Sequence, residues 1–260
     1  VILYDETIKQ TSSLKKTIPE LISDSGAIPG IKVDTGAKKQ AQINNETITE
    51  GLDGLSERLK TYYDLGARFT KWRGVFKISI KNNLPSSESI KSNAHALGRY
   101  SALVQEANMV PIIEPEVLMD GDHDIKTCYQ ITKIVLEETF DQLSNNNINL
   151  KGIILKPNMI LNGAESGIKN ETKQVAEMTL NCLKENVPKD VPGIAFLSGG
   201  QTELEATKNL NEINKINNSN FIMSYSYGRA LQQSALKFWS KDINNIKGTQ
   251  DTFNHRANMC

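Results

Sequence analysis

Short apolar segments rich in β-branched residues alternate along this chain with longer segments of helical spacing. Such alternation is typical of a parallel sheet whose strands are joined by right-handed crossovers, so it predicts an α/β fold. Runs of a few apolar residues bounded by turn residues are typical of strands buried on both faces. The predicted strands are Val1–Tyr4, Ile28–Val33, Ala67–Ile78, Met109–Val117, Gly152–Lys156, Gly193–Leu197 and Phe221–Tyr225.

The number of predicted strands favours a (β/α)8 TIM barrel that lacks its first β/α unit. The chain opens on Val1–Tyr4, already inside a predicted strand, so we expect a fragment that is cut at both ends. One further unit upstream would complete the eight strands of such a barrel. An open, doubly wound sheet is the alternative, although no glycine-rich GxGxxG turn follows any strand. No linker divides residues 1–260, which we expect to form a single, partial barrel domain.

Three helices carry recognisable start signals. Residues Ser86–Asn108 repeat apolar positions at helical spacing, and Ser86 is a suitable N-cap. A second helix is predicted over Asp124–Ser144. The sequence Thr202-Glu203-Leu204-Glu205 has the form of a capping box and predicts the start of a third.

The charge balance and the cysteines limit where the protein works and what it binds. The 30 basic and 30 acidic residues leave no positive excess for nucleic acid or an anionic membrane. No apolar run approaches the roughly 20 residues of a membrane span. Cys128, Cys182 and Cys260 are odd in number and form no CxxC pattern, which indicates reduced thiols. We therefore expect a cytoplasmic protein without nucleic-acid or membrane partners.

Lys156 ends the most informative strand. In the segment Gly152–Met159 three aliphatic residues lead directly into this lysine, and Pro157 then ends the strand. Burying an ammonium group is costly, so a lysine held here without enough compensation loses its proton more readily and becomes an amine nucleophile. The alternative is an ordinary strand-end lysine paired with a carboxylate.

Charged residues also stand at the ends of other predicted strands. Alternation places Lys71 and Arg73 on one face of their strand, and Glu114 and Glu116 on one face of the next, while Lys32 ends an earlier strand. In a β/α barrel the carboxyl ends of the strands carry the active site. Charges of both signs delivered to one level by successive strands therefore predict an active site there.

The last two predicted strands lead into loops suited to bind anions. Leu197–Gln201 contains Ser198, Gly199 and Gly200 before a helix, where backbone N–H groups and the helix dipole favour a phosphate. The loop after the last strand offers Ser226, Gly228 and Arg229. Loops in these positions form the usual phosphate site of the barrel class.

A second phosphate could bind across the mouth of the barrel. Lys32, Lys71 and Arg73 are the cations available for it. Two such sites predict a doubly phosphorylated small molecule as the ligand.

A metal site is not predicted. Asp120, Asp122 and Asp124 imitate the start of an EF-hand, but Ile125 and Ile131 stand where that loop requires glycine and glutamate. These acids instead favour the start of the following helix. No serine elbow or Cys–His pattern indicates acyl transfer. The histidines, which lack metal-ligand spacing, are His95, His123 and His255.

Taken together, these segments closely resemble class I fructose-1,6-bisphosphate aldolases, the metal-independent enzymes that use a Schiff base. The resemblance extends over nearly the whole chain in the family's order. The matching segments are Gly30–Asp34, Gly51–Arg58, Lys71–Arg73, Glu114–Glu116, Asp120–Asp124, Leu155–Met159, Leu197–Gln201 and Ser226–Leu231.

The resemblance implies a role for each candidate residue. Lys156 would be the Schiff-base lysine, Glu114 the proton-shuttling acid and base, and Glu116 the neighbouring carboxylate that orients the lysines. Lys71 would be the second active-site lysine, and its charge would further favour a neutral Lys156. The implied C6-phosphate contacts are Lys32 and Arg73, and the implied C1-phosphate contacts are Ser198, Gly199, Gly228 and Arg229. The family's first strand, with its catalytic aspartate, and its mobile carboxy-terminal tail would lie outside Val1–Cys260.

The implied activity is reversible cleavage of fructose 1,6-bisphosphate to dihydroxyacetone phosphate and glyceraldehyde 3-phosphate in glycolysis and gluconeogenesis, without a cofactor. The resemblance also implies a homotetramer and, for some members, cytoskeletal partners. Two alternatives remain open at this point. One is a Schiff-base aldolase for another phosphorylated sugar, and the other is an inactive aldolase-like binding scaffold.

Overall fold

A seven-stranded parallel sheet forms the centre of the fold. The computed structural model describes residues 1–43 and 45–260. Within them the strand order is β1-β2-β5-β6-β7-β8-β9, and every neighbouring pair in this sheet is parallel. The strands are β1 (Ile2–Leu3), β2 (Gly30–Lys32), β5 (Phe69–Phe76), β6 (Val110–Val117), β7 (Ile154–Leu155), β8 (Gly193–Phe196) and β9 (Ile222–Tyr225).

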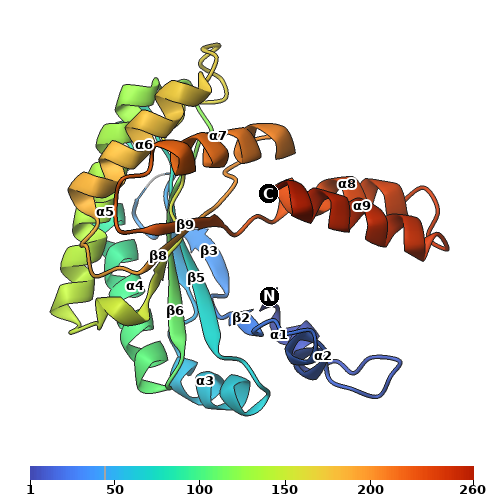
Figure 1. Cartoon of the computed structure of the whole chain (residues 1–260). Helices are drawn as coiled ribbons and strands as arrows, with labels where there is room; N and C mark the ends of the chain where they lie inside the picture. The colour runs from blue at the N-terminus through green and yellow to red at the C-terminus, as the bar shows by residue number, and fades with distance from the viewer. Residues whose placement is uncertain (44) are drawn as a thin grey trace.

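The sheet is of the barrel type. Its strands follow one another in chain order without a reversal, so the sheet lacks the switch point that a doubly wound fold requires. Figure 1 shows α4, α5, α6 and α7 along one side of the curved sheet. The prediction of an α/β barrel fold is therefore confirmed, and the open doubly wound alternative is wrong. All seven predicted strands are present, although each is shorter than the sequence pattern indicated.

Helices connect the strands and cover the sheet. The starts predicted at Ser86, Asp124 and Thr202 are confirmed, because each side chain accepts a hydrogen bond from the third residue of its helix. In the part of the chain that the structure describes, no helix is long and apolar enough to cross a membrane. The α-helices are α1 (Asp5–Ile8), α2 (Ile18–Asp24), α3 (Leu55–Asp64), α4 (Ser87–Glu106), α5 (Ile125–Asn145), α6 (Thr172–Asn186), α7 (Glu203–Ile216), α8 (Arg229–Trp239) and α9 (Ile246–Met259).

A small hairpin was not predicted from the sequence. Strands β3 (Gly36–Lys39) and β4 (Thr47–Glu50) pair antiparallel, outside the main sheet. Most of β3 is exposed, so its residues need not alternate between apolar and polar, and the periodicity that reveals a strand is missing. The hairpin nevertheless contacts the barrel, since Thr49 Oγ1 donates a hydrogen bond of 2.6 Å to the backbone oxygen of Arg73.

The side chains of β5 alternate between the helix layer and the inner face of the sheet. Trp72 is fully buried, and its ring lies 5.5 Å from that of Tyr100 on α4. Burying a large apolar side chain of this kind stabilises the fold by about 2–3 kcal/mol. Because Trp72 fixes which face points outward, Lys71 and Arg73 on either side of it point inward, as the sequence predicted.

Candidate active site

Lys156 lies immediately after β7, at the carboxyl end of the sheet. Its backbone N–H donates to the oxygen of Ile113 over 2.8 Å, so the β6–β7 ladder continues to this residue. The residue is 8% exposed, and proline follows it. The ladder and the proline together fix where the lysine leaves the sheet, which agrees with the position predicted from the sequence.

Glu114 on β6 holds two lysines at once. Its Oε1 accepts a hydrogen bond of 2.6 Å from Lys156 Nζ, and its Oε2 lies 2.9 Å from Lys71 Nζ. Lys71 forms an ion pair with Oε2, so each oxygen of this buried carboxylate faces one lysine. Glu114 therefore orients both amines.

Burial and charge alter how this cluster binds protons. Burial lowers the pKa of Lys156 and is the main cause of the shift; Glu114 opposes it, and the positive charge of Lys71 adds to it. Burial alone would raise the pKa of Glu114, but Lys71 and Lys156 outweigh it and hold that pKa below its usual value. The environment thus makes the ammonium form of Lys156 less favourable than in water and keeps Glu114 ionised, and burial contributes more to the Lys156 shift than the repulsion between lysines.

Glu116 and Arg73 form a second pair beside the first. The Arg73 Nε donates a short hydrogen bond to Glu116 Oε2. Burial raises the pKa of Glu116, and the guanidinium of Arg73 limits that rise. In the backbone pairing of β5 with β6, Arg73 lies opposite Glu114, whereas its side chain pairs with Glu116, two residues further along β6. Lys71 likewise reaches two residues beyond its own register partner, Ile112, because strands in a barrel-type sheet are tilted.

Asp34 completes the cluster on the side of β2. Its Oδ1 lies 2.6 Å from Lys32 Nζ, and its Oδ2 lies 3.6 Å from Lys71 Nζ. Asp34 lies within the matching segment Gly30–Asp34, but no role was predicted for it from the sequence. The alternation in Lys32-Val33-Asp34 could have shown that Asp34 shares a face with Lys32.

The loop after β8 lies next to Lys156. The backbone N–H of Leu197 donates to the oxygen of Pro157 over 3.2 Å, which brings the following residue, Ser198, to the same edge. Gly199 and Gly200 have φ angles of +56° and +88°, a left-handed conformation that only glycine adopts without strain. The loop then leads into α7, so its backbone N–H groups lie near a helix amino terminus.

The loop after β9 reaches the same edge of the sheet. Ser226 N–H donates to the oxygen of Phe196 over 2.9 Å, and Gly228 precedes α8, whose first residue is Arg229. Arg229 is exposed. Among the described residues, no hydrogen bond or ion pair joins Arg229 to the Lys156 cluster. The structure thus brings Lys32, Lys71, Arg73, Glu114, Glu116 and Lys156 together and leaves at their rim the two loops that were predicted to bind anions.

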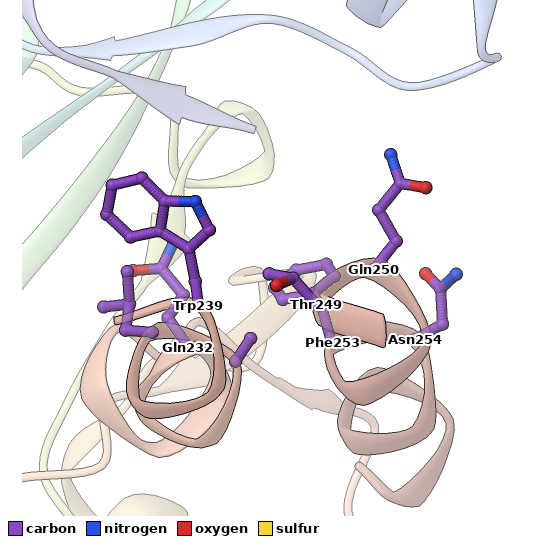
Figure 2. Close-up of a pocket in the computed structure, with 8 residues that line it drawn as sticks. Gln232, Trp239, Thr249, Gln250, Phe253 and Asn254 are labelled. Carbon is purple, nitrogen blue, oxygen red and sulfur yellow. The ribbon is translucent and has the colours of Figure 1, made fainter. Parts of the chain in front are cut away.

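A separate cavity lies between α8 and α9. It has a volume of about 670 Å³, and Figure 2 shows Trp239 on one helix and Phe253 on the other beside it. The side chains around it are apolar or uncharged: Gln232, Ala235, Leu236, Trp239, Thr249, Gln250, Phe253 and Asn254. In the described part of the chain, no titratable side chain lines this cavity, in contrast to the lysine cluster.

A barrel-type parallel sheet with lysines and carboxylates buried at the carboxyl ends of its strands defines a β/α barrel enzyme. The family model described as fructose-bisphosphate aldolase class-I matches residues 1–260. The chain belongs to the class-I fructose-bisphosphate aldolase family, as the resemblance implied.

Individual relatives agree with this assignment. A probable class 1 fructose-bisphosphate aldolase of Xanthomonas campestris is 51% identical over 242 residues, which cover 93% of this chain and 72% of the relative. Cytosolic fructose-bisphosphate aldolase 4 of Arabidopsis thaliana is 46% identical over 99% of this chain and 65% of its own.

A solved structure gives the same result for the fold. Fructose-bisphosphate aldolase from Plasmodium falciparum, in complex with TRAP and a small-molecule inhibitor, superimposes with a TM-score of 0.96 at 41% identity. The match covers 99% of this chain and 74% of that one.

Proposed function

We propose that this protein reversibly cleaves fructose 1,6-bisphosphate to dihydroxyacetone phosphate and glyceraldehyde 3-phosphate through a Schiff base on Lys156. The observation that carries the proposal is the buried Lys156 amine, 2.6 Å from Glu114, with Lys71 at the other oxygen of the same carboxylate. This arrangement unites a nucleophile, a proton carrier and a cation. Membership of the class-I aldolase family supports the same reaction.

The amine acts first. Neutral Lys156 attacks the C2 ketone of the open-chain sugar to give a carbinolamine, whose loss of water leaves an iminium ion. The C4 hydroxyl then loses its proton and the C3–C4 bond breaks. The electron pair of that bond flows into the iminium to form an enamine, and the aldehyde departs. Protonation of the enamine and hydrolysis release the ketone and restore the amine.

Glu114 supplies the proton transfers. Its Oε1 accepts a hydrogen bond of 2.6 Å from the Lys156 amine, so it can exchange a proton with the nucleophile during dehydration and cleavage. Lys71 and Lys156 lower the pKa of Glu114, which favours the base form at the start of the cycle.

Phosphate binding would hold the substrate across this cluster. Ser198, Gly199, Ser226, Gly228 and Arg229 would bind one phosphate, and Lys32 with Arg73 the other. The left-handed glycines before α7 support the first site, because they leave backbone N–H groups free to approach an anion. Fixing both ends of the sugar positions C2 over the lysine.

The biological setting follows from the reaction. We propose a cytoplasmic enzyme of glycolysis and gluconeogenesis, a single barrel domain that works as a homotetramer. Plant relatives named as cytosolic aldolases support the location. The Plasmodium aldolase in complex with TRAP supports a capacity for protein partners.

Borohydride trapping tests the mechanism. The full-length protein should be treated with dihydroxyacetone phosphate and borohydride, digested, and analysed by mass spectrometry. A reduced adduct is expected on the peptide that contains Lys156. An unmodified Lys156 in a protein that still cleaves the sugar would overturn the proposal.

The substrate is tested separately. Cleavage of fructose 1,6-bisphosphate should be faster than cleavage of fructose 1-phosphate, because only the bisphosphate can occupy both proposed phosphate sites. Equal rates would favour an aldolase for another phosphorylated sugar, and absence of cleavage would favour a binding scaffold.

A further inference from the structure

Asp34 is a buried carboxylate that joins two strands of the candidate active site. Its side chain is 2% exposed. Oδ1 lies 2.6 Å from Lys32 Nζ and accepts a hydrogen bond of 3.1 Å from Gly36 N–H. Oδ2 accepts a hydrogen bond of 3.4 Å from Arg73 N–H. Donors from the β2 end and from β5 therefore fix the carboxylate on both sides.

Asp34 also stands at the end of a buried row in which carboxylates and lysines alternate. Lys71 Nζ lies 3.6 Å from Asp34 Oδ2 and 2.9 Å from Glu114 Oε2, and the other oxygen of Glu114 contacts Lys156. The order along the row is Asp34, Lys71, Glu114 and Lys156. Coulomb interactions over these distances are strong where water is excluded, so a change at one end affects the whole row.

The proposed reaction changes the charge at the far end of this row. Glu114 accepts and releases protons, and Lys156 passes from amine to iminium. Whenever Glu114 is neutral, Lys71 loses one of its two carboxylate partners. Among the described residues Asp34 is the other one.

We infer that Asp34 is a positioning residue, which holds the Lys71 ammonium group beside Glu114 while Glu114 exchanges protons. This inference rests on the proposed function and deepens it. Asp34 does not touch Lys156, so it acts through Lys71 and takes no proton from the substrate. Asp34 also contacts Lys32, a proposed phosphate contact, so the experiment must separate the loss of this contact from the loss of the contact with Lys71.

The test replaces Asp34 with its uncharged isostere. Asp34→Asn keeps the shape of the side chain and removes its charge, so kcat should fall by about 10- to 100-fold through misplacement of Lys71. The fall should appear with both fructose 1,6-bisphosphate and the 1-monophosphate, because Lys71 acts through Glu114, whose proton transfers both sugars require. Asp34→Glu, which retains the charge, should recover part of kcat.

A double-variant cycle shows whether Asp34 acts through Lys71. The rate of adduct formation with dihydroxyacetone phosphate is measured in single turnovers for Asp34→Asn, Lys71→Met and the double variant. We expect the two losses not to add, because the second change acts on a cation already removed. A residue with only a structural role would give additive losses.

The matched control is Asp124→Asn. Asp124 caps α5, and asparagine caps a helix equally well, so this variant should keep wild-type kcat and thermal stability. Unchanged kcat in a folded Asp34→Asn protein would overturn the inference, as would additive losses or a loss confined to the bisphosphate. If wild-type Lys156 traps the ketone in any of these cases, the proposed function stands and only the role of Asp34 fails.

Discussion

The side-chain nitrogen of Lys156 lies 2.6 Å from Oε1 of Glu114, and both side chains are almost fully buried. A buried ion pair normally adds little to the stability of a protein, since removing both ions from water costs several kcal/mol per ion. The cost has a chemical consequence here. Burial makes the ammonium form of Lys156 less favourable, and the adjacent carboxylate can accept the proton that the amine releases.

Replacing the nucleophile should remove turnover. Lys156→Met keeps the length of the side chain without its amine, so cleavage should fall by about 10⁶-fold, as on loss of other covalent nucleophiles. A coupled cleavage assay measures this. The control is Lys151→Met, which replaces an exposed lysine just before β7 and should retain full activity. Substantial turnover by a folded Lys156→Met protein would mean that another residue is the nucleophile.

Glu114→Gln should slow the proton transfers without preventing substrate binding. Glutamine keeps the size of the side chain but cannot accept a proton, and such a loss usually lowers the rate by about 10²- to 10⁴-fold. We expect the effect in kcat, with little change in KM. The surface variant Glu137→Gln, whose native side chain forms an exposed pair with Lys133, serves as control. Loss of binding with intact kcat would assign Glu114 a different role.

The pH dependence of adduct formation should respond in opposite directions to two substitutions. Glu114 raises the pKa of Lys156 and Lys71 lowers it. Glu114→Gln should therefore move the acidic limb of the profile to lower pH, and Lys71→Met should move it to higher pH. The rate of borohydride-trapped adduct, measured across pH for each variant, checks both signs. The positions are apparent values of the coupled cluster, so the direction of each shift is decisive.

The sheet was predictable because each strand satisfies the same requirement. A strand covered by helices on one side and enclosed by the curved sheet on the other must be apolar on both faces, so it appears as a short aliphatic run. The hairpin β3–β4 meets no such requirement. The residues of β3 are largely exposed, and Lys38 and Lys39 could equally belong to a loop. Exposure therefore explains why β3 was missed.

The position of the charged residues at the carboxyl ends of the strands was predictable from the sequence, but which residues pair with one another was not. Alternation gives the face of Lys71, Arg73, Glu114 and Glu116, and it makes the strand ends meet at one edge. It does not give the tilt that connects Lys71 with Glu114 and Arg73 with Glu116, each two residues beyond its register partner. The role of Asp34 was missed for the same reason, since its contact with Lys71 joins two strands.

A glycine variant with a matched control tests the anion-binding loop after β8. Gly199 has φ +56° and Gly167, in the loop before α6, has φ +69°. Alanine in this left-handed conformation costs roughly 1–2 kcal/mol, so both alanine variants should lose stability to a similar extent. A new Cβ at Gly199 would lie 3.1 Å from Leu197 Cδ1, whereas at Gly167 it would meet no atom within 4 Å.

Only Gly199→Ala should weaken substrate binding. The loop that contains Gly199 follows β8, the strand next to β7 and Lys156. Its backbone N–H groups precede α7, where a phosphate would bind. A methyl group there crowds the approach of the anion, so KM for fructose 1,6-bisphosphate should rise about 10-fold, equivalent to about 1.4 kcal/mol. Gly167→Ala should leave KM unchanged at the same loss of thermal stability. Equal KM values for the two variants would show that strain alone explains the effect and that the phosphate binds elsewhere.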